Sequence, residues 1–96
     1  MRLLYIVTYD ICDDKRLREV FRLMRGYGEH MQYSVFRCEL SDLERVELIG
    51  QLTDIINMNE DQVLFFPLGP AGGERETGIV ALGKVYEAVD HKAIVI

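Results

Sequence analysis

One carboxylate, Asp10, stands where this chain could carry out metal-dependent chemistry. It directly follows an apolar run, so a rigid strand would present its side chain at the end of a sheet. Mg²⁺ needs about six oxygen ligands, so a lone carboxylate would hold the ion poorly. If two copies met along this strand, two Asp10 side chains could anchor one hydrated Mg²⁺ that polarises a phosphodiester and activates water. The alternative is that Asp10 is only a turn residue.

The second chemical signal is a basic segment in which five bases occur within eleven consecutive residues, with one acid among them. On a helix this segment rises roughly 15 Å, which matches four or five phosphates spaced at roughly 3.4 Å along one strand. The pattern predicts binding to a nucleic-acid backbone without base readout, and the alternative is a solvated helix face. The bases are Lys15, Arg16, Arg18, Arg22 and Arg25.

Other reactive side chains give weaker signals. His30 is a candidate for proton transfer beside a phosphate, although a lone histidine is more often structural. Ser34 could contact a phosphate or bond the backbone. Cys12 and Cys38 lack the spacing of a zinc site, so we expect ordinary reduced thiols. No Cys/His or Ser/His/Asp nucleophile arrangement is visible, and no P-loop lysine follows the glycines near the end of the chain.

The composition is that of one small globular domain. The chain has 96 residues, of which 49% are hydrophobic and 28% charged. The net charge of -5 argues against a nucleic-acid partner, whereas the local basic segment argues for one. Because no apolar stretch approaches the roughly 20 residues of a membrane span and no cleavage-site pattern follows the amino end, we expect a cytoplasmic protein without membrane contact.

The first half of the chain contains a strand and a helix. Leu3–Tyr9 is apolar, β-branched and aromatic, which indicates a central strand. A helix is expected from about Asp14 to Tyr27, with Asp13 and Asp14 as caps and favourable charges at its start. We expect Gly26 and Gly28 to end it. Its apolar face consists of Leu17, Val20, Phe21, Met24 and Tyr27.

The second half alternates strands with another helix. Residues 29–40 favour either one bent strand or a short hairpin turning near Tyr33 and Ser34. Ser41 and Glu44 fit a capping box that opens a helix to about Asn57. This helix is expected to be buried through Val46, Ile49, Leu52, Ile55 and Ile56. Residues 61–68 form the next strand, and Pro67 places it at a sheet edge or near its own end.

This order predicts an α+β, ferredoxin-like βαββαβ sandwich spanning residues 1–68. Residues 69–96 would add a hinge and a C-terminal strand tail to the same domain, with strand candidates at residues 79–82 and 93–96. Both helices would cover one sheet face, so a second copy would cover the other, and the tail strand could join the partner's sheet edge. We therefore expect a homodimer.

Three segments taken together resemble the CRISPR-associated endoribonuclease family (Cas2), the smaller of the two universal CRISPR adaptation proteins. They are Tyr9–Ile11, Asp13–Val20 and Gly28–Phe36, in order and with family-like spacing, and the resemblance covers residues 2–68. It implies a ferredoxin-like homodimer with a Mg²⁺-dependent nuclease activity and a scaffold role beside the integrase that inserts new spacers. Asp10 matches the family's metal-binding aspartate, and Arg16 and Arg18 match its basic first helix.

Two classes of function remain open. As an enzyme, the protein would cleave phosphodiester bonds in RNA or DNA through Asp10 and Mg²⁺. As a binding module, it would hold duplex DNA along its arginines and bridge integrase dimers without catalysis. A third possibility is a small RNA-binding or ligand-sensing ferredoxin-like domain, although the aromatic signature of an RRM is missing from the expected strands.

Overall fold

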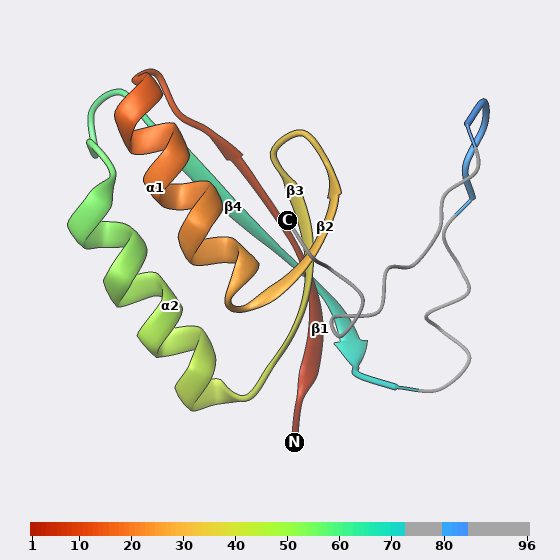
Figure 1. Cartoon of the computed structure of the whole chain (residues 1–96). Helices are drawn as coiled ribbons and strands as arrows, with labels where there is room; N and C mark the ends of the chain where they lie inside the picture. Colours follow the sequence, from red (N-terminus) through yellow and green to blue (C-terminus); the bar gives the residue numbers. More distant parts are fainter. Residues whose placement is uncertain (73–79, 85–96) are drawn as a thin grey trace.

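The computed structural model describes residues 1–72 and 80–84, which include a sheet and two helices. The elements follow in the order β1 (Leu3–Asp10), α1 (Asp14–Arg25), β2 (Gly28–Gln32), β3 (Val35–Leu40), α2 (Asp42–Ile55) and β4 (Gln62–Pro70). The strands form one antiparallel sheet in the order β2-β3-β1-β4, and both helices cover one of its faces (Figure 1). This arrangement confirms the predicted α+β, ferredoxin-like fold.

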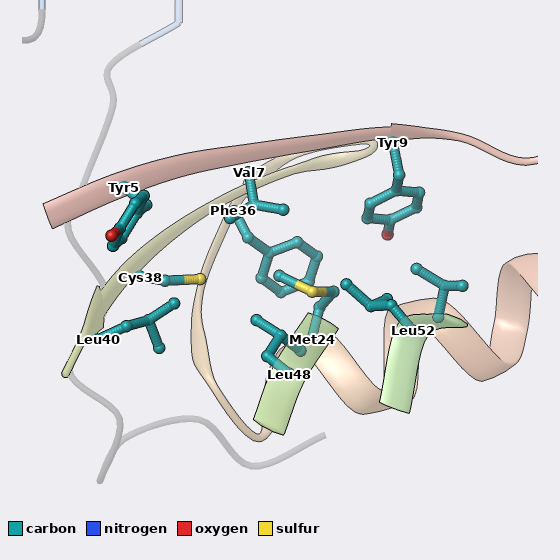
Figure 2. Close-up of a cluster of buried hydrophobic side chains, with 10 residues drawn as sticks. Tyr5, Val7, Tyr9, Met24, Phe36, Cys38, Leu40, Leu48 and Leu52 are labelled. Carbon is teal, nitrogen blue, oxygen red and sulfur yellow. The ribbon is translucent and has the colours of Figure 1, made fainter. Parts of the chain in front are cut away.

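The central strand β1 supplies alternate side chains to the core. Tyr5, Val7 and Tyr9 project toward the helices, where Met24 of α1 and Leu52 of α2 meet them (Figure 2). Val7 and Met24 are completely buried. Because successive strand residues point to opposite faces, Ile6, Thr8 and Asp10 belong to the face opposite α1 and α2.

Helix α1 begins as the sequence predicts and ends two residues earlier. The Asp13 carboxylate accepts a hydrogen bond from the Arg16 backbone N–H at 3.0 Å, and Gly26 is the C-cap. Gly28 does not end the helix, because it is already the first residue of β2. A Cβ atom there would lie 2.5 Å from both the Arg37 carbonyl oxygen and the Cys38 sulfur, so only glycine allows β2 to approach β3 this closely.

Residues 28–40 form a hairpin, which settles the alternative left open by the sequence. The chain reverses at Tyr33 and Ser34 between β2 and β3. Tyr33 has a φ of 37°, in the left-handed region that favours glycine. The carbonyl oxygen of Tyr33 lies 2.7 Å from His30 Nε2, and that of Ser34 accepts a 3.1 Å hydrogen bond from the Tyr9 backbone N–H. Contacts from β1 and β2 therefore hold the turn.

Helix α2 confirms the predicted capping box and corrects the predicted burial. The Ser41 hydroxyl accepts from the Glu44 backbone N–H at 3.1 Å, and the Glu44 carboxylate accepts from the Ser41 N–H at 2.9 Å. Leu48 and Leu52 are the buried residues, whereas the prediction was wrong for Val46 and Ile49, which are 57% and 40% exposed. The predicted positions Val46, Ile49 and Leu52 are three residues apart, and on a helix of 3.6 residues per turn such positions rotate progressively away from one face. Leu48 and Leu52 are four residues apart and therefore lie on the same face.

Strand β4 is an edge strand, as Pro67 predicts. It extends to Pro70, and its register with β1 shifts between Leu4 and Tyr5. The expected tail strand at residues 93–96 and most of the hinge lie outside the described residues. Residues 80–82, from the other strand candidate, are described and form no strand. Neither described helix is long and apolar enough to cross a membrane.

Candidate functional site

Asp10 is the last residue of β1 and lies opposite Gln62 of the edge strand β4. Its side chain is exposed, and strand alternation places it on the sheet face away from both helices. Within residues 1–72 and 80–84, no hydrogen bond or ion pair involves the Asp10 carboxylate. Its oxygens therefore remain available to a hard cation such as Mg²⁺.

A buried carboxylate, Asp61, fixes the turn that follows Asp10. Its oxygens accept from the Cys12 backbone N–H and from the Asn57 backbone N–H, both at 2.8 Å. The Arg16 guanidinium donates from Nε at 2.8 Å and from Nη2 at 3.3 Å. The Arg16 pairing, followed by the two backbone donors, holds the pKa of Asp61 far below its usual range although burial opposes this. Asp61 thus joins the start of α1 to the loop before β4.

The thiol beside Asp10 is not poised to react. Desolvation raises the pKa of Cys12, and the negative charges of Asp61 and Asp10 raise it further. The Cys12 sulfur lies 2.9 Å from the Glu60 carbonyl oxygen, to which the thiol donates. Burial raises the pKa of the other thiol, Cys38, to about 12. Both cysteines are free, as expected, and both favour the protonated form at neutral pH.

The described part of one chain does not gather a complete set of metal ligands. In these segments, no three His, Cys, Asp or Glu side chains come close enough to share an ion. Asp10 is a hard oxygen donor of the kind that Mg²⁺ takes in small numbers together with water and phosphate oxygens. The donor chemistry therefore fits Mg²⁺, and a second carboxylate would have to come from a partner copy, with water and substrate phosphate oxygens completing the ligand set.

The basic residues of α1 divide into two groups. Arg16 turns toward the loop before β4, where it pairs with Asp61 and, at 3.0 Å, with Glu60. Arg18, Arg22 and Arg25 instead line a pocket of about 460 Å³. None of these three forms an ion pair with a residue the structure describes. Lys15 is exposed at the start of the helix.

The pocket lies between α1 and the tip of the hairpin. Besides the three arginines, its lining residues are Tyr9, Leu17, Phe21, Tyr33 and Ser34. Burial raises the pKa of Tyr9, and a hydrogen bond with the Ser34 side chain lowers it in part. The His30 ring packs against the ring of Phe21, one of the lining residues, with centroids 5.1 Å apart. We name this cavity the arginine pocket.

The structure brings the arginines together with aromatic rings and keeps them apart from Asp10. The arginine pocket lies on the helix-covered side of the sheet, whereas Asp10 points to the open side. Sequence reasoning missed Asp61 and Tyr33. No sequence motif identifies Asp61, because two of its hydrogen-bond partners, Cys12 and Arg16, lie in a distant segment of the chain. Tyr33 could have been noticed as an aromatic residue at an expected turn, where polar residues and glycine are commoner.

Comparison with known proteins places these features in a family. Residues 1–75 match the family described as CRISPR associated protein Cas2. The chain is 40% identical over 92 residues to the CRISPR-associated endoribonuclease Cas2 1 of Rhodospirillum rubrum, covering 96% of this chain and 89% of that one. It is 47% identical over 68 residues to a CRISPR-associated endoribonuclease Cas2 of Thermodesulfovibrio yellowstonii, covering 71% of this chain and 75% of that one.

The fold of this chain is also similar to that of a solved structure. The Streptococcus pyogenes Cas2 crystal structure superposes with a TM-score of 0.71 at 33% identity and covers 83% of this chain and 99% of that one. The family match over residues 1–75 includes Asp10, helix α1 and the hairpin, which are the segments whose residues resemble the family. On its sequence and its fold, this chain belongs to the Cas2 family of CRISPR-associated proteins.

Proposed function

We propose that this protein is a homodimeric, Mg²⁺-dependent endoribonuclease that acts in CRISPR spacer acquisition and binds nucleic acid along α1. The observation that carries the proposal is Asp10, an exposed carboxylate at the end of the central strand that pairs with no residue the structure describes, on the sheet face opposite α1 and α2. The curated relatives are named endoribonucleases, which supports RNA as the substrate.

The homodimer rests on the apolar character of the open sheet face. Leu64 and Phe66 of β4 are 42% and 46% exposed on that face, next to Ile6 of β1. Apolar side chains gathered on one side of a small sheet favour association with another surface. In a two-fold dimer the same patch meets itself, so the β1 strands and their Asp10 side chains would approach each other.

Different residues of the chain would bind the metal ion and the nucleic-acid backbone. The two Asp10 carboxylates would hold the ion, and Lys15, Arg18, Arg22 and Arg25 of α1 would bind backbone phosphates of the nucleic acid at a distance from the scissile bond. When bound, Mg²⁺ supplies charge neutralisation at the phosphodiester and lowers the pKa of water. Arg16 would act at a distance, because its pairing with Asp61 fixes the turn after Asp10.

The second candidate function is a scaffold that holds duplex DNA beside the CRISPR integrase without cleaving it. The separation of the two features favours it, because Arg18 and Arg22 line a surface on the opposite side of the sheet from Asp10. Binding along α1 therefore does not require Asp10. The two functions are compatible and differ in whether Asp10 matters.

Replacing Asp10 by Asn tests the catalytic proposal. We expect cleavage of single-stranded RNA in Mg²⁺ to fall at least about 100-fold, because a neutral amide attracts the ion weakly while keeping the shape of the side chain. Binding of RNA in a chelator and the thermal midpoint should stay unchanged. Undiminished hydrolysis in Asp10→Asn, or in the parent with excess chelator, would contradict the proposal and leave the scaffold function.

Breaking the dimer tests the shared site. Phe66→Glu places a charge on the open sheet face, and Val46→Glu places the same charge on α2, whose Val46 is 57% exposed. We expect sedimentation to give twice the chain mass of 11.1 kDa for the parent and for Val46→Glu, and a monomer without nuclease activity for Phe66→Glu. A parent that sediments as a monomer at micromolar concentration would overturn the two-Asp10 site.

A further inference from the structure

The tip of the hairpin exposes an aromatic ring beside the arginines. Tyr33 is 89% exposed, the largest exposed fraction of any tyrosine or phenylalanine among the described hydrophobic residues. Its φ of 37° is unfavourable for a residue with a side chain. Conformations of this kind persist where the surrounding structure enforces them, and they occur often at ligand-binding sites.

The surroundings of Tyr33 hold the turn in place. His30 Nε2 lies 2.7 Å from the Tyr33 carbonyl oxygen, and the next carbonyl, that of Ser34, accepts from Tyr9 of β1. The His30 ring packs against both Phe21 and Phe36, at centroid distances of 5.1 and 5.0 Å. An aromatic side chain on a fixed backbone loses little conformational freedom when a ligand stacks on it, which favours binding.

The arginine pocket combines flat apolar walls with positive charge. Tyr33 and Phe21 are aromatic lining residues, and Arg18 and Arg22 are exposed basic ones. The Arg25 guanidinium carbon lies 5.7 Å from the centroid of the Phe21 ring, so this ring and this charge are already associated. Proteins that bind single-stranded nucleic acid use the same combination of stacking surfaces and basic side chains.

We propose that the arginine pocket binds an unpaired nucleobase, stacked on Tyr33, while Arg18 and Arg22 bind the adjoining phosphates. The site would make the protein prefer single-stranded over paired nucleic acid at this surface. The inference rests on the proposed binding of nucleic acid along α1 and goes beyond it, since phosphate contacts alone do not distinguish an unpaired base from a paired one.

Size and chemistry favour a base over other occupants. A cavity of about 460 Å³ is within the usual range of small-molecule sites. A duplex keeps its bases stacked inside, so it could contact the arginines but would offer no free base face for the Tyr33 ring to stack on. An acidic peptide could also neutralise the arginines, but its carboxylates would gain nothing from two aromatic rings. The pairing of rings with guanidinium groups therefore points to a nucleotide.

The experiment compares one RNA in two forms, in a chelator that prevents cleavage. An RNA of about 10 nucleotides, within the site sizes typical of single-strand binders, is titrated alone and annealed to its complement. We expect Tyr33→Ala to weaken binding of the single strand by about 5- to 150-fold and to leave duplex binding unchanged. The matched variant Tyr33→Phe keeps the ring and should bind like the parent, whereas Arg22→Ala should weaken both forms.

Each outcome decides the question. If Tyr33→Ala binds the single strand like the parent while Arg22→Ala weakens both forms, the base pocket is wrong and the phosphate surface stands. If the parent binds neither form, both ideas fail. If an acidic peptide of equal charge competes as well as the RNA and Tyr33→Ala is without effect, the pocket recognises polyanions in general. Because Tyr33 is exposed, unchanged thermal unfolding should accompany the loss of single-strand affinity.

Discussion

The two helices lie on the same face of the same sheet (Figure 1), and their net charges have opposite signs. Helix α1 contains five basic residues and two acidic ones, whereas α2 contains four acidic residues and one basic. The net charge of -5 therefore describes neither surface. A polyanion such as nucleic acid would be attracted to α1 and repelled from α2, so the charge of a protein has to be judged element by element.

The helices also differ in how their apolar residues are used. In α1 the buried residues Val20 and Met24 lie on one face, and the partly buried ones pack beside them. In α2 only Leu48 and Leu52 are buried, while Leu43 and Val46 are 66% and 57% exposed. Helix α1 is therefore a two-sided element with a core face and a basic face. Helix α2 shows no such separation.

The largest effect on folding should come from the core side of α2. Leu48 is completely buried, so Leu48→Ala removes packed methyl groups and leaves a cavity, at an expected cost of about 2–5 kcal/mol in the free energy of unfolding. The matched variant Val46→Ala on the same helix should change it by less than about 0.5 kcal/mol. Chemical denaturation of both measures this. Equal losses would show that Val46 is buried in the protein in solution.

This contrast shows why burial within α2 was hard to predict. The caps depend on neighbouring residues, so the sequence revealed Asp13 and the Ser41 capping box correctly. Helix α2 contains apolar residues nearly all round, and Val46, Ile49, Leu52 and Ile55 offered a stripe as plausible as the one that the fold uses. Packing against the sheet decided between them, and that information is tertiary.

An intermediate effect should come from the buried carboxylate that joins α1 to the loop after α2. Asp61 has a lowered pKa in the folded protein, so its contribution to stability is present above the ordinary carboxyl pKa and is lost as the pH falls below it. Asp61→Asn removes that contribution. We expect the parent to be more stable than the variant at neutral pH, and this advantage to shrink below about pH 4.

The control for Asp61 is a carboxylate on the surface of α2. Asp54 is exposed, and in the structured ranges no hydrogen bond involves its side chain. The difference between the parent and Asp54→Asn should therefore change little with pH. Urea denaturation between about pH 3 and pH 7, at one protein concentration, measures both. A parent advantage over Asp61→Asn that persists undiminished at low pH would contradict the assignment.

The candidate site was only partly predictable for the same reason. Asp10 and the arginines of α1 are close in sequence, and a strand followed by a helix is enough to propose them. The roles of Arg16 and Tyr33 depend on residues far along the chain or on a turn conformation. Arg16 was predicted to bind nucleic acid as part of the basic segment, and the structure shows that it pairs with Asp61, 45 residues away. Pairwise partners at such separations leave no periodic signal.

The smallest effect on folding, and the sharpest test of the charge contrast, should come from the exposed Arg22 of α1, with the half-buried Arg45 of α2 as its control. Arg22 lies on the rim of the arginine pocket, and Arg45 lies on acidic α2, 4.0 Å from Asp42. Arg22→Ala should change the free energy of unfolding by less than about 0.5 kcal/mol. It should weaken duplex DNA binding to the same degree whatever the base sequence, because phosphate contacts carry no sequence information.

The salt dependence separates a phosphate contact from a general loss of charge. Each phosphate contact contributes about 0.9 to the slope of log K against log salt, and a dimer with both surfaces engaged loses two contacts per substitution. Arg22→Ala and Arg18→Ala should each reduce the slope by about 0.9 for every phosphate contact that is lost. Arg45→Ala removes the same charge from α2 and should leave the slope unchanged. If Arg45→Ala reduced the slope as much as Arg22→Ala, net charge alone would govern binding, and the division of labour between α1 and α2 would be wrong.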